Sequence, residues 1–325
     1  MLSSAKSMLR RIRGLGRIIA DYAYDARRYF RYSSTGRSEL GYDGLRARLY
    51  QKSHSIEKGL SMPVVRSGFG ETPFRELTRC LAIYEREGYD RTDPAYRKAI
   101  GVINAYVEHH RDQAFPARLE FIRSFEGRGS APADGGVMLR TREEILAGTT
   151  GDFASLVASR HSIRMFADAA VSRDALEAAV SIAAGAPSVC NRQGGHIHIV
   201  ERPDAVAAAL KIQGGNHGFS DQIKTLVVVT ELLPIFRDSR ERNQAYIDGG
   251  LFAMTLLYAL HSLGLGACPL NWSTTRHTDR ALRKALDLPD EETVVVMIAV
   301  GELRDEFRVA RSARRPVAQI IRYID

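Results

Sequence analysis

Residues 160–164 read Arg-His-Ser-Ile-Arg, with one arginine on each side of a central serine. Arginine stays charged and presents a rigid fork of N–H donors, so paired arginines are suited to holding a phosphate or a carboxylate. The serine hydroxyl adds a neutral donor between them. Taken alone, the spacing is common by chance, and a surface loop with two solvated arginines explains it better. The segment becomes informative only together with others.

A second polar segment follows at residues 186–193, which read Ala-Pro-Ser-Val-Cys-Asn-Arg-Gln after Gly185. Glycine and proline here predict that a helix ends and the chain turns sharply. Ser188 and Asn191 then offer hydrogen-bonding side chains, and an amide that both donates and accepts suits the edge of a heterocyclic ring. The simpler alternative is that both side chains only stabilise the turn.

Glycines mark a third segment, Asp248-Gly249-Gly250, which leads to residues 264–269, Gly-Leu-Gly-Ala-Cys-Pro. Glycine permits close approach of the backbone, and for residues 249–250 helix packing is favoured over a ligand contact. Cys268 is expected to be a small buried residue and not a nucleophile. Near the C-terminus, three arginines at 311, 314 and 315 precede Pro316.

Together and in this order, the four segments resemble the FMN-dependent nitroreductase family over residues 151–325. The resemblance implies that residues 160–164 contact the FMN phosphate, ribityl chain and pyrimidine edge, and that residues 186–193 bond to the flavin. It also implies a loop at 269–271 running past the isoalloxazine ring, with a main-chain N–H facing N5, and an arginine that completes the phosphate site. The cofactor-binding residues so implied are Arg160, Ser162, Arg164, Ser188, Asn191, Pro269, Leu270, Asn271, Arg314 and, as second choice, Arg311.

The family usually continues the second segment with Gln-Pro-Trp, whereas this chain has Gln193-Gly194-Gly195. The absence of the proline and the aromatic residue is expected to change the wall of the pocket. Substrate preference should therefore differ from that of relatives more than flavin binding does.

The resemblance implies an FMN-dependent NAD(P)H oxidoreductase that passes electrons to a small-molecule acceptor in a ping-pong cycle. FMN would carry the chemistry at the interface of a homodimer, so no catalytic side chain is required. No Gly-x-Gly-x-x-Gly motif follows a strand, and the sequence does not distinguish NADH from NADPH. One alternative is a relative that uses reduced flavin for dehalogenation, ring oxidation or flavin breakdown. Another is a flavin-binding accessory protein at the inner membrane face.

The N-terminal half contains one chemically distinctive run, His54 to Ser61, which reads His-Ser-Ile-Glu-Lys-Gly-Leu-Ser. Its His54, Glu57 and Lys58 could act as acid, base and anion clamp. The run resembles a segment ahead of the nitroreductase-like domain in some bacterial proteins linked to surface-polysaccharide gene clusters. The favoured alternative is an ordinary helix end, with Lys58 and Gly59 as its C-terminal signals.

The elements that position these segments differ between the two halves of the chain. Residues 1–126 are expected to be mostly helical, with helix starts at Asp93-Pro94, running to His109, and at Thr72-Pro73, running over 74–87. Glycine, proline and small residues at 127–136 indicate a linker. The predicted organisation is a helical region over 1–130, a linker over 131–150 and a nitroreductase-like domain over 151–325.

Short runs rich in β-branched residues at 195–200, 224–230 and 293–300 predict buried strands. Between them, Ser172 is placed to cap a helix that runs to Ala183, and residues 243–263 predict a long apolar helix. The expected fold class is α+β, a nitroreductase-like mixed sheet flanked by helices and preceded by a mostly helical region.

The net charge of +8 is concentrated in an N-terminal arm, because residues 1–32 hold eight lysines and arginines against two aspartates. No nucleic-acid-binding pattern accompanies the arm, so nucleic acid is not an expected partner. Apolar residues recur at helical spacing among the arginines, which suits either packing on the protein, the favoured alternative, or contact with an anionic membrane surface. No secretory signal or membrane span is predicted. Three scattered cysteines without metal-ligand spacing favour the cytoplasm and predict no metal site.

Overall fold

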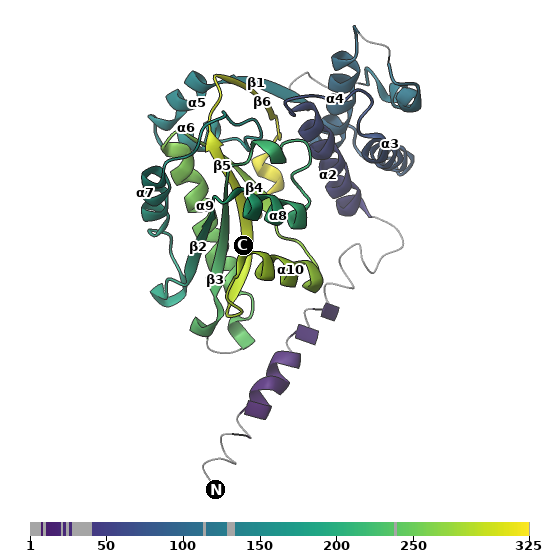
Figure 1. The fold of residues 1–325 in the computed structure, drawn as a ribbon. Coiled ribbons are helices and arrows are strands. Elements are labelled where there is room, and N and C mark those ends of the chain that lie inside the picture. Colours follow the sequence, from purple (N-terminus) through teal and green to yellow (C-terminus); the bar gives the residue numbers. More distant parts are fainter. Residues whose placement is uncertain are drawn as a thin grey trace. The chain divides into compact units, whose positions relative to one another are not determined.

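The computed structural model describes residues 8, 11–20, 22–23, 26–27, 41–112, 115–128, 134–236 and 239–324 (Figure 1). Two compact units emerge: residues 142–304 grouped with 1–38, and residues 39–141 grouped with 305–325. This division differs from the predicted boundaries, because the last 21 residues (305–325) group with the helical unit and not with the nitroreductase-like unit.

Three helices form the body of the helical unit: α2 (Tyr42–Leu60), α3 (Glu71–Arg86) and α4 (Pro94–His109), followed by the 3₁₀ helix η2 (Ala117–Phe125). The bounds of α4 are those predicted, since the Asp93 carboxylate accepts a hydrogen bond from Ala95 N and proline occupies the first turn. Helix α3 begins at Glu71, because Gly70 takes a left-handed conformation (φ 89°) just before it. Buried aromatic side chains such as Phe74, Tyr84 and Tyr106 join the helices in one core.

The helical unit also contains a two-stranded antiparallel sheet in which β1 (Val137–Thr141) pairs with β6 (Glu306–Ala310). The 131–150 segment is therefore not wholly a linker: β1 is followed directly by α5 (Arg142–Thr149), while residues 129–133 lie outside the described residues. The two strands are more than 160 positions apart in sequence, so no local pattern indicates their pairing.

A four-stranded sheet organises the other unit, in the order β2-β3-β5-β4. Strand β2 (Gly195–Val200) has the predicted bounds, whereas β3 (Thr225–Leu232) and β5 (Glu292–Glu302) extend beyond the predicted runs. Strand β4 (Leu265–Asn271) forms one edge of the sheet, whereas a turn and a loop were predicted for this segment. All strand pairs are antiparallel, and an isolated parallel bridge between Ser162 and Ala267 adds to the β4 edge. The α+β class is confirmed.

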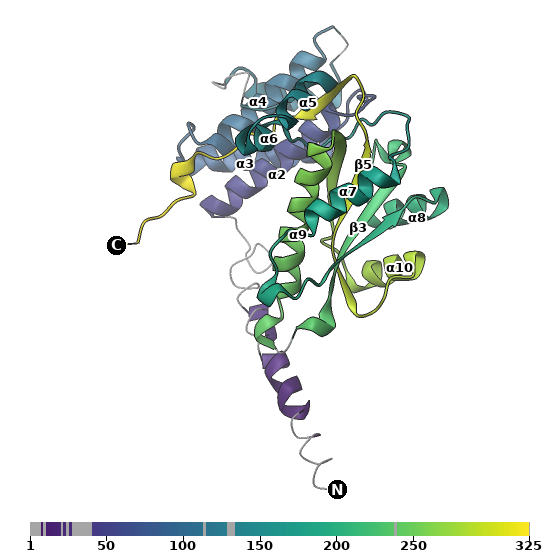
Figure 2. The same ribbon diagram turned by 90° about the vertical axis from the view of Figure 1, so that its left-hand side faces the viewer.

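Helices cover both faces of this sheet (Figure 2). Helices α7 (Arg173–Ala183) and α9 (Gln244–Ser262) pack on one face, and α8 (Pro203–Gln213) and α10 (Arg276–Leu286) lie on the other. Ser172 caps α7 as predicted, its Oγ accepting from Ala175 N. A Cβ on Gly249 would lie 2.5 Å from Val295 Cγ2, so close packing of α9 on β5 requires this glycine. The packing interpretation holds for Gly249, whereas Gly250 faces open space.

Among the described residues, no helix has both the length and the apolar character needed to cross a membrane.

Candidate functional site

The segment with the paired arginines lies along the β4 edge of the sheet. It follows α6 (Phe153–Ser159), and Ile163 N donates a hydrogen bond to Ala267 O (3.0 Å). Phe166 then bridges to Leu303 and is buried. Backbone pairing on both sides of Arg164 therefore fixes the position of its Cα atom, from which the side chain extends.

Arg164 is a buried cation whose hydrogen-bonding capacity is not used up. Its side chain is 6% exposed, and its Nη1 lies 3.5 Å from the carbonyl oxygen of Ser162, a long contact for a hydrogen bond. Its Nε is buried without a partner. A buried guanidinium is stable only when charge and hydrogen bonds compensate for lost hydration. An anion beside Arg164 would provide that compensation, which fits the predicted role in binding phosphate.

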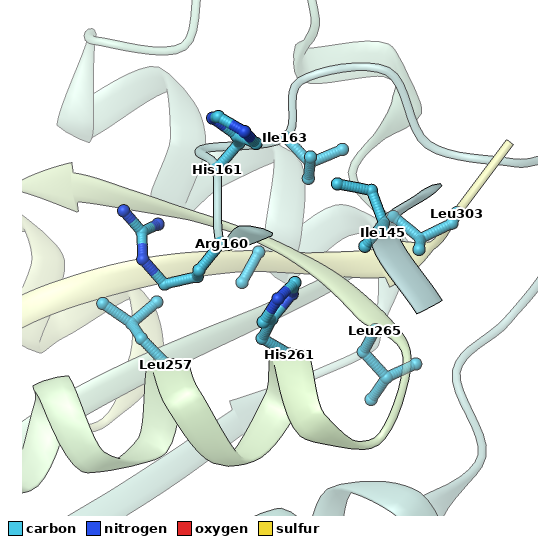
Figure 3. A pocket seen from close by; sticks show the side chains of 9 residues that line it. Ile145, Arg160, His161, Ile163, Leu257, His261, Leu265 and Leu303 are labelled. Atoms are coloured by element: carbon cyan, nitrogen blue, oxygen red, sulfur yellow. The ribbon is translucent and has the colours of Figure 1, made fainter. Parts of the chain in front are cut away.

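Arg160 and His161 lie on the chain just before this point, with the ring of His261 rising from α9 beside them (Figure 3). His261 is buried, and its Nε2 is 2.7 Å from Ser159 Oγ. Burial and then the positive charges of Arg160 and His161 lower the pKa of His261 to about 4. The imidazole is therefore neutral at physiological pH, and the local potential is positive.

The cavity enclosed by these residues has a volume of only 10 Å³. That space holds about one water molecule. This cavity is therefore too small for a cofactor.

The second predicted segment, residues 186–193, lies before β2 at the opposite edge of the sheet. Ser188 Oγ accepts a hydrogen bond from Gln193 N (2.9 Å), and Asp248 Oδ2 accepts one from Val189 N (3.0 Å). Asp248 thus anchors the loop to α9. Three non-glycine residues in the loop, Cys190, Asn191 and Gln193, have φ values of 50°, 54° and 52°. Such conformations are uncommon and concentrate at ligand-binding loops.

A cavity of 210 Å³ opens beside this loop. Ser188 and Gln193 line it, together with Glu231 from β3 and Asp248 and Phe252 from α9. Burial, and secondly the charge of Asp248, raises the pKa of Glu231 to about 7. Glu231 is not among the residues predicted from the sequence, although an acidic residue near the end of the largely apolar β3 is a usable signal. A larger cavity of 790 Å³ along α8 and residues 214–225 contains none of the predicted site residues.

The predicted residues thus fall into two groups on opposite edges of one sheet. Strands β2 and β4 are separated by three inter-strand spacings, about 14 Å. Arg160, Ser162 and Arg164 accompany β4, whereas Ser188 and Asn191 precede β2. A single chain does not bring the two groups together.

The residues expected in a loop past the flavin ring lie instead within β4. Leu270 is buried, and Asn271 O accepts a hydrogen bond from Gln213 Nε2 (2.9 Å). Pro269 is exposed, as suits an edge strand, where a missing N–H breaks no ladder.

Arg311 and Arg314 belong to the helical unit. Arg311 N donates to Gly136 O (3.2 Å), and the Arg314 side chain is exposed. Their predicted contact with phosphate stays a prediction.

The sequence of this region is similar to a known protein family. The family model described as the nitroreductase family matches residues 157–215 and 205–302. Residues 157–302, the nitroreductase-family region, are thus the part of the chain that is similar to this family. The matched nitroreductase region contains both groups of predicted residues and β4, and it ends before Arg311 and Arg314.

An enone reductase of CLA biosynthesis from Lactiplantibacillus plantarum is 32% identical over 108 residues, covering 31% of this chain and 48% of the relative. The chain thus spans about half the length of this curated relative. A nitroreductase family protein from Streptococcus pneumoniae is 19% identical, with 53% of this chain and 100% of that one covered and a TM-score of 0.46. An FMN-dependent nitroreductase from Clostridium difficile is 20% identical, with coverages of 45% and 85% and a TM-score of 0.41.

Proposed function

We propose that this protein is an FMN-dependent oxidoreductase that takes electrons from NAD(P)H and passes them to a small-molecule acceptor in a ping-pong cycle. Bound FMN would supply the hydride chemistry. The observation that carries the proposal is Arg164, a buried guanidinium with an unpartnered Nε within the nitroreductase-family region. A phosphate at this position would complete both its charge and its hydrogen bonding.

The chain's own residues would then bind, orient and shield the cofactor. Arg164 and Arg160 would neutralise the phosphate at the β4 edge, where Ser162 is held against Ala267. Ser188 and Asn191 would bond to the flavin ring from the loop at the β2 edge, which Asp248 fixes to α9.

The placement of these two groups on opposite edges supports a homodimer, in which each site combines the β4 edge of one protomer with the β2 edge of its partner. The apolar surface needed for such an interface is present. Tyr246, Ile247 and Leu251 of α9 are 58%, 54% and 44% exposed, and Phe153 of α6 is also exposed. Solvated apolar clusters of this kind mark protein–protein interfaces.

The absorbance spectrum of the purified full-length protein tests the proposed function. We expect flavin absorbance bands at about 370 and 450 nm. These bands should bleach when NADPH or NADH is added under anaerobic conditions, because the flavin accepts the hydride. Subsequent addition of an acceptor such as a quinone should restore the bands. A protein that takes up no FMN even after reconstitution would overturn the proposal, and a bound flavin that neither nucleotide reduces would favour the accessory role.

A second candidate function, peripheral contact with an anionic membrane surface in the cytoplasm, is favoured by the N-terminal arm. Residues 11–20 are helical, and all described residues of 8–27 are exposed. At 100° per residue, Ile12, Leu15 and Ile19 fall on one narrow stripe, while Arg13 and Arg17 lie on the far side. A helix with one apolar and one cationic face is suited to the headgroup region.

Deletion of residues 1–32 should abolish sedimentation with vesicles that contain anionic phospholipid, while leaving the flavin content unchanged. The loss is expected because the arm holds six of the eight net positive charges and the exposed apolar stripe. Vesicles of neutral phospholipid provide the control, since they should bind neither protein. Equal binding of the full-length and shortened proteins would remove the membrane function.

A further inference from the structure

Glu231 is a buried acid whose carboxylate is left without any hydrogen-bond partner. Its side chain is 1% exposed, and among the described residues neither Oε1 nor Oε2 has a hydrogen-bond partner. It lines the 210 Å³ cavity next to Ser188 and Phe252. A buried polar group in this condition destabilises the fold, so its presence calls for a function.

Two glycines make room for the groups that shape this wall. A Cβ on Gly194 would lie 2.4 Å from Glu231 Oε1, and a Cβ on Gly195 would lie 2.8 Å from the ring of Phe252. Any larger residue at these positions would displace the carboxyl group or the ring. The Gln193-Gly194-Gly195 sequence therefore accommodates an acid and an aromatic ring at this cavity.

Another glutamate one strand away shows how the chain satisfies a buried acid. Glu292 Oε2 accepts hydrogen bonds from Thr230 Oγ1 (2.5 Å) and from the His198 ring (2.6 Å). Burial alone would raise the pKa of Glu292, but these two hydrogen bonds bring it below its usual value. Glu231, on the opposite face of the sheet, receives no such bonds. The lack of hydrogen-bond partners is therefore a property of Glu231 beside the cavity and is not shared by Glu292.

Charged groups face Glu231 from α9 and from β2. Asp248 on α9 adds to the effect of burial and favours the neutral acid, whereas His196 on β2 opposes it. The β5 neighbour is Thr293, which does not titrate. Arg192 of the loop is occupied by Glu241 (2.6 Å) and Ile235 O (2.7 Å). With a pKa of about 7, Glu231 can hold a proton at physiological pH.

We propose that Glu231 is a proton-donating residue that hydrogen-bonds the carbonyl oxygen of a flat, uncharged acceptor seated in this cavity against Phe252. A neutral carboxyl group is a donor that matches a carbonyl oxygen. The Phe252 ring and the apolar side chains of Val180 and Pro187 suit a conjugated ring. Asp248, which lines the same cavity, disfavours anionic ligands.

The proposal rests on the proposed function, because a reduced flavin is the source of electrons. Reduction of a quinone to its hydroquinone needs a hydride and a proton. Bound FMN, when reduced, would supply the hydride and be oxidised, and Glu231 would give the proton to the carbonyl oxygen. Glu231 is left as a carboxylate and regains its proton from solvent.

Binding of duroquinone to the oxidised holoprotein, measured by calorimetry without any electron donor, provides a test independent of turnover. Since only the neutral acid donates the hydrogen bond, affinity should be constant below about pH 7 and fall about tenfold per pH unit above it. Proton uptake, obtained from two buffers of different ionisation enthalpy, should accompany binding above pH 7. In Glu231→Gln the amide donates at every pH, so both effects should vanish.

The rate of reoxidation of the reduced protein by duroquinone then tests proton donation. In Glu231→Gln this rate should fall on the order of 100- to 10,000-fold and lose its pH dependence, because an amide holds no transferable proton. Glu292→Gln is the matched control, a buried glutamate of the same sheet that does not line the cavity. It should keep the wild-type pH profile.

The outcomes separate this proposal from the proposed function. A wild-type protein that binds no FMN, or is reduced by neither nucleotide, contradicts the function itself. If the wild type is reduced and reoxidised normally but Glu231→Gln, folded by circular dichroism, shows the same pH profile and rate, the proton-donating role of Glu231 is wrong. A shift of the profile in Glu292→Gln as large as in Glu231→Gln would also overturn it.

Discussion

Replacing Lys98 with methionine is expected to lower the free energy of unfolding of the helical unit by about 3–5 kcal/mol. Lys98 is 3% exposed, and its Nζ lies 2.7 and 2.9 Å from the two carboxylate oxygens of the fully buried Glu57. Without the lysine, Glu57 would be a buried charge left with the N–H of Gly136 (3.2 Å) and the half-exposed ring of His54, whose Nδ1 is 3.9 Å from Oε2. Urea unfolding followed by circular dichroism measures the loss.

Two further variants identify the cause of that loss. Arg97→Ala removes a neighbouring residue of α4 that pairs with Asp134 (2.9 Å) at the surface, and it should cost less than about 1 kcal/mol. The double variant Glu57→Gln/Lys98→Met removes both buried charges and should recover most of the stability. If Lys98→Met and Arg97→Ala were equally mild, the buried pair would not stabilise the unit.

This ion pair also explains Glu57, one of the three residues of the His54–Ser61 run with two possible interpretations. Glu57 joins α2 to α4 through Lys98, a partner 41 positions away that no local pattern indicates. Helix α2 ends at Leu60, directly after Lys58 and Gly59, which confirms the interpretation of the run as a helix end. Glu57 thus has a structural explanation, and the acid, base and clamp hypothesis gains no support from it.

Local rules predicted the elements whose signals are local. An aspartate and a proline started α4, a serine capped α7, and a β-branched run gave β2 its bounds. Strand β4 was not predicted because Gly266 and Pro269 are typical of turns. Both residues are tolerated in this strand because it lies at the edge of the sheet. The β1–β6 pair was not predicted because it joins two segments that flank residues 157–302, one before and one after them in the sequence.

The candidate site was predictable in its residue types but not in its arrangement. The sequence indicated Arg164 and Ser188, yet only the sheet order shows that they lie on different edges. The burial of Arg164 and the missing partner of its Nε likewise depend on tertiary packing. Glu231 was overlooked because it follows the run predicted over 224–230, whereas β3 extends to Leu232 and so includes this charged residue in a buried strand.

Replacing Arg164 with alanine should weaken FMN binding by about 1.5–3 kcal/mol, the contribution of a hydrogen bond to a charged group. This corresponds to roughly a 10- to 150-fold rise in the dissociation constant. The reason is geometric: the guanidinium is buried, its Nε is unpartnered, and backbone bonds on both sides hold it at the β4 edge. Titration of the apoprotein with FMN, followed by quenching of flavin fluorescence, measures the change.

Arg173→Ala provides the matched control for a general loss of positive charge. Arg173 starts α7 in the same unit, but its side chain is 80% exposed and pairs with Glu201 (2.9 Å) at the surface. FMN affinity should therefore be unchanged in this variant. Arg164→Lys should fall between wild type and alanine, because an ammonium keeps the charge but not the fork of donors. Wild-type affinity in a folded Arg164→Ala protein would exclude Arg164 from the cofactor site and with it the observation that supports phosphate binding at this edge.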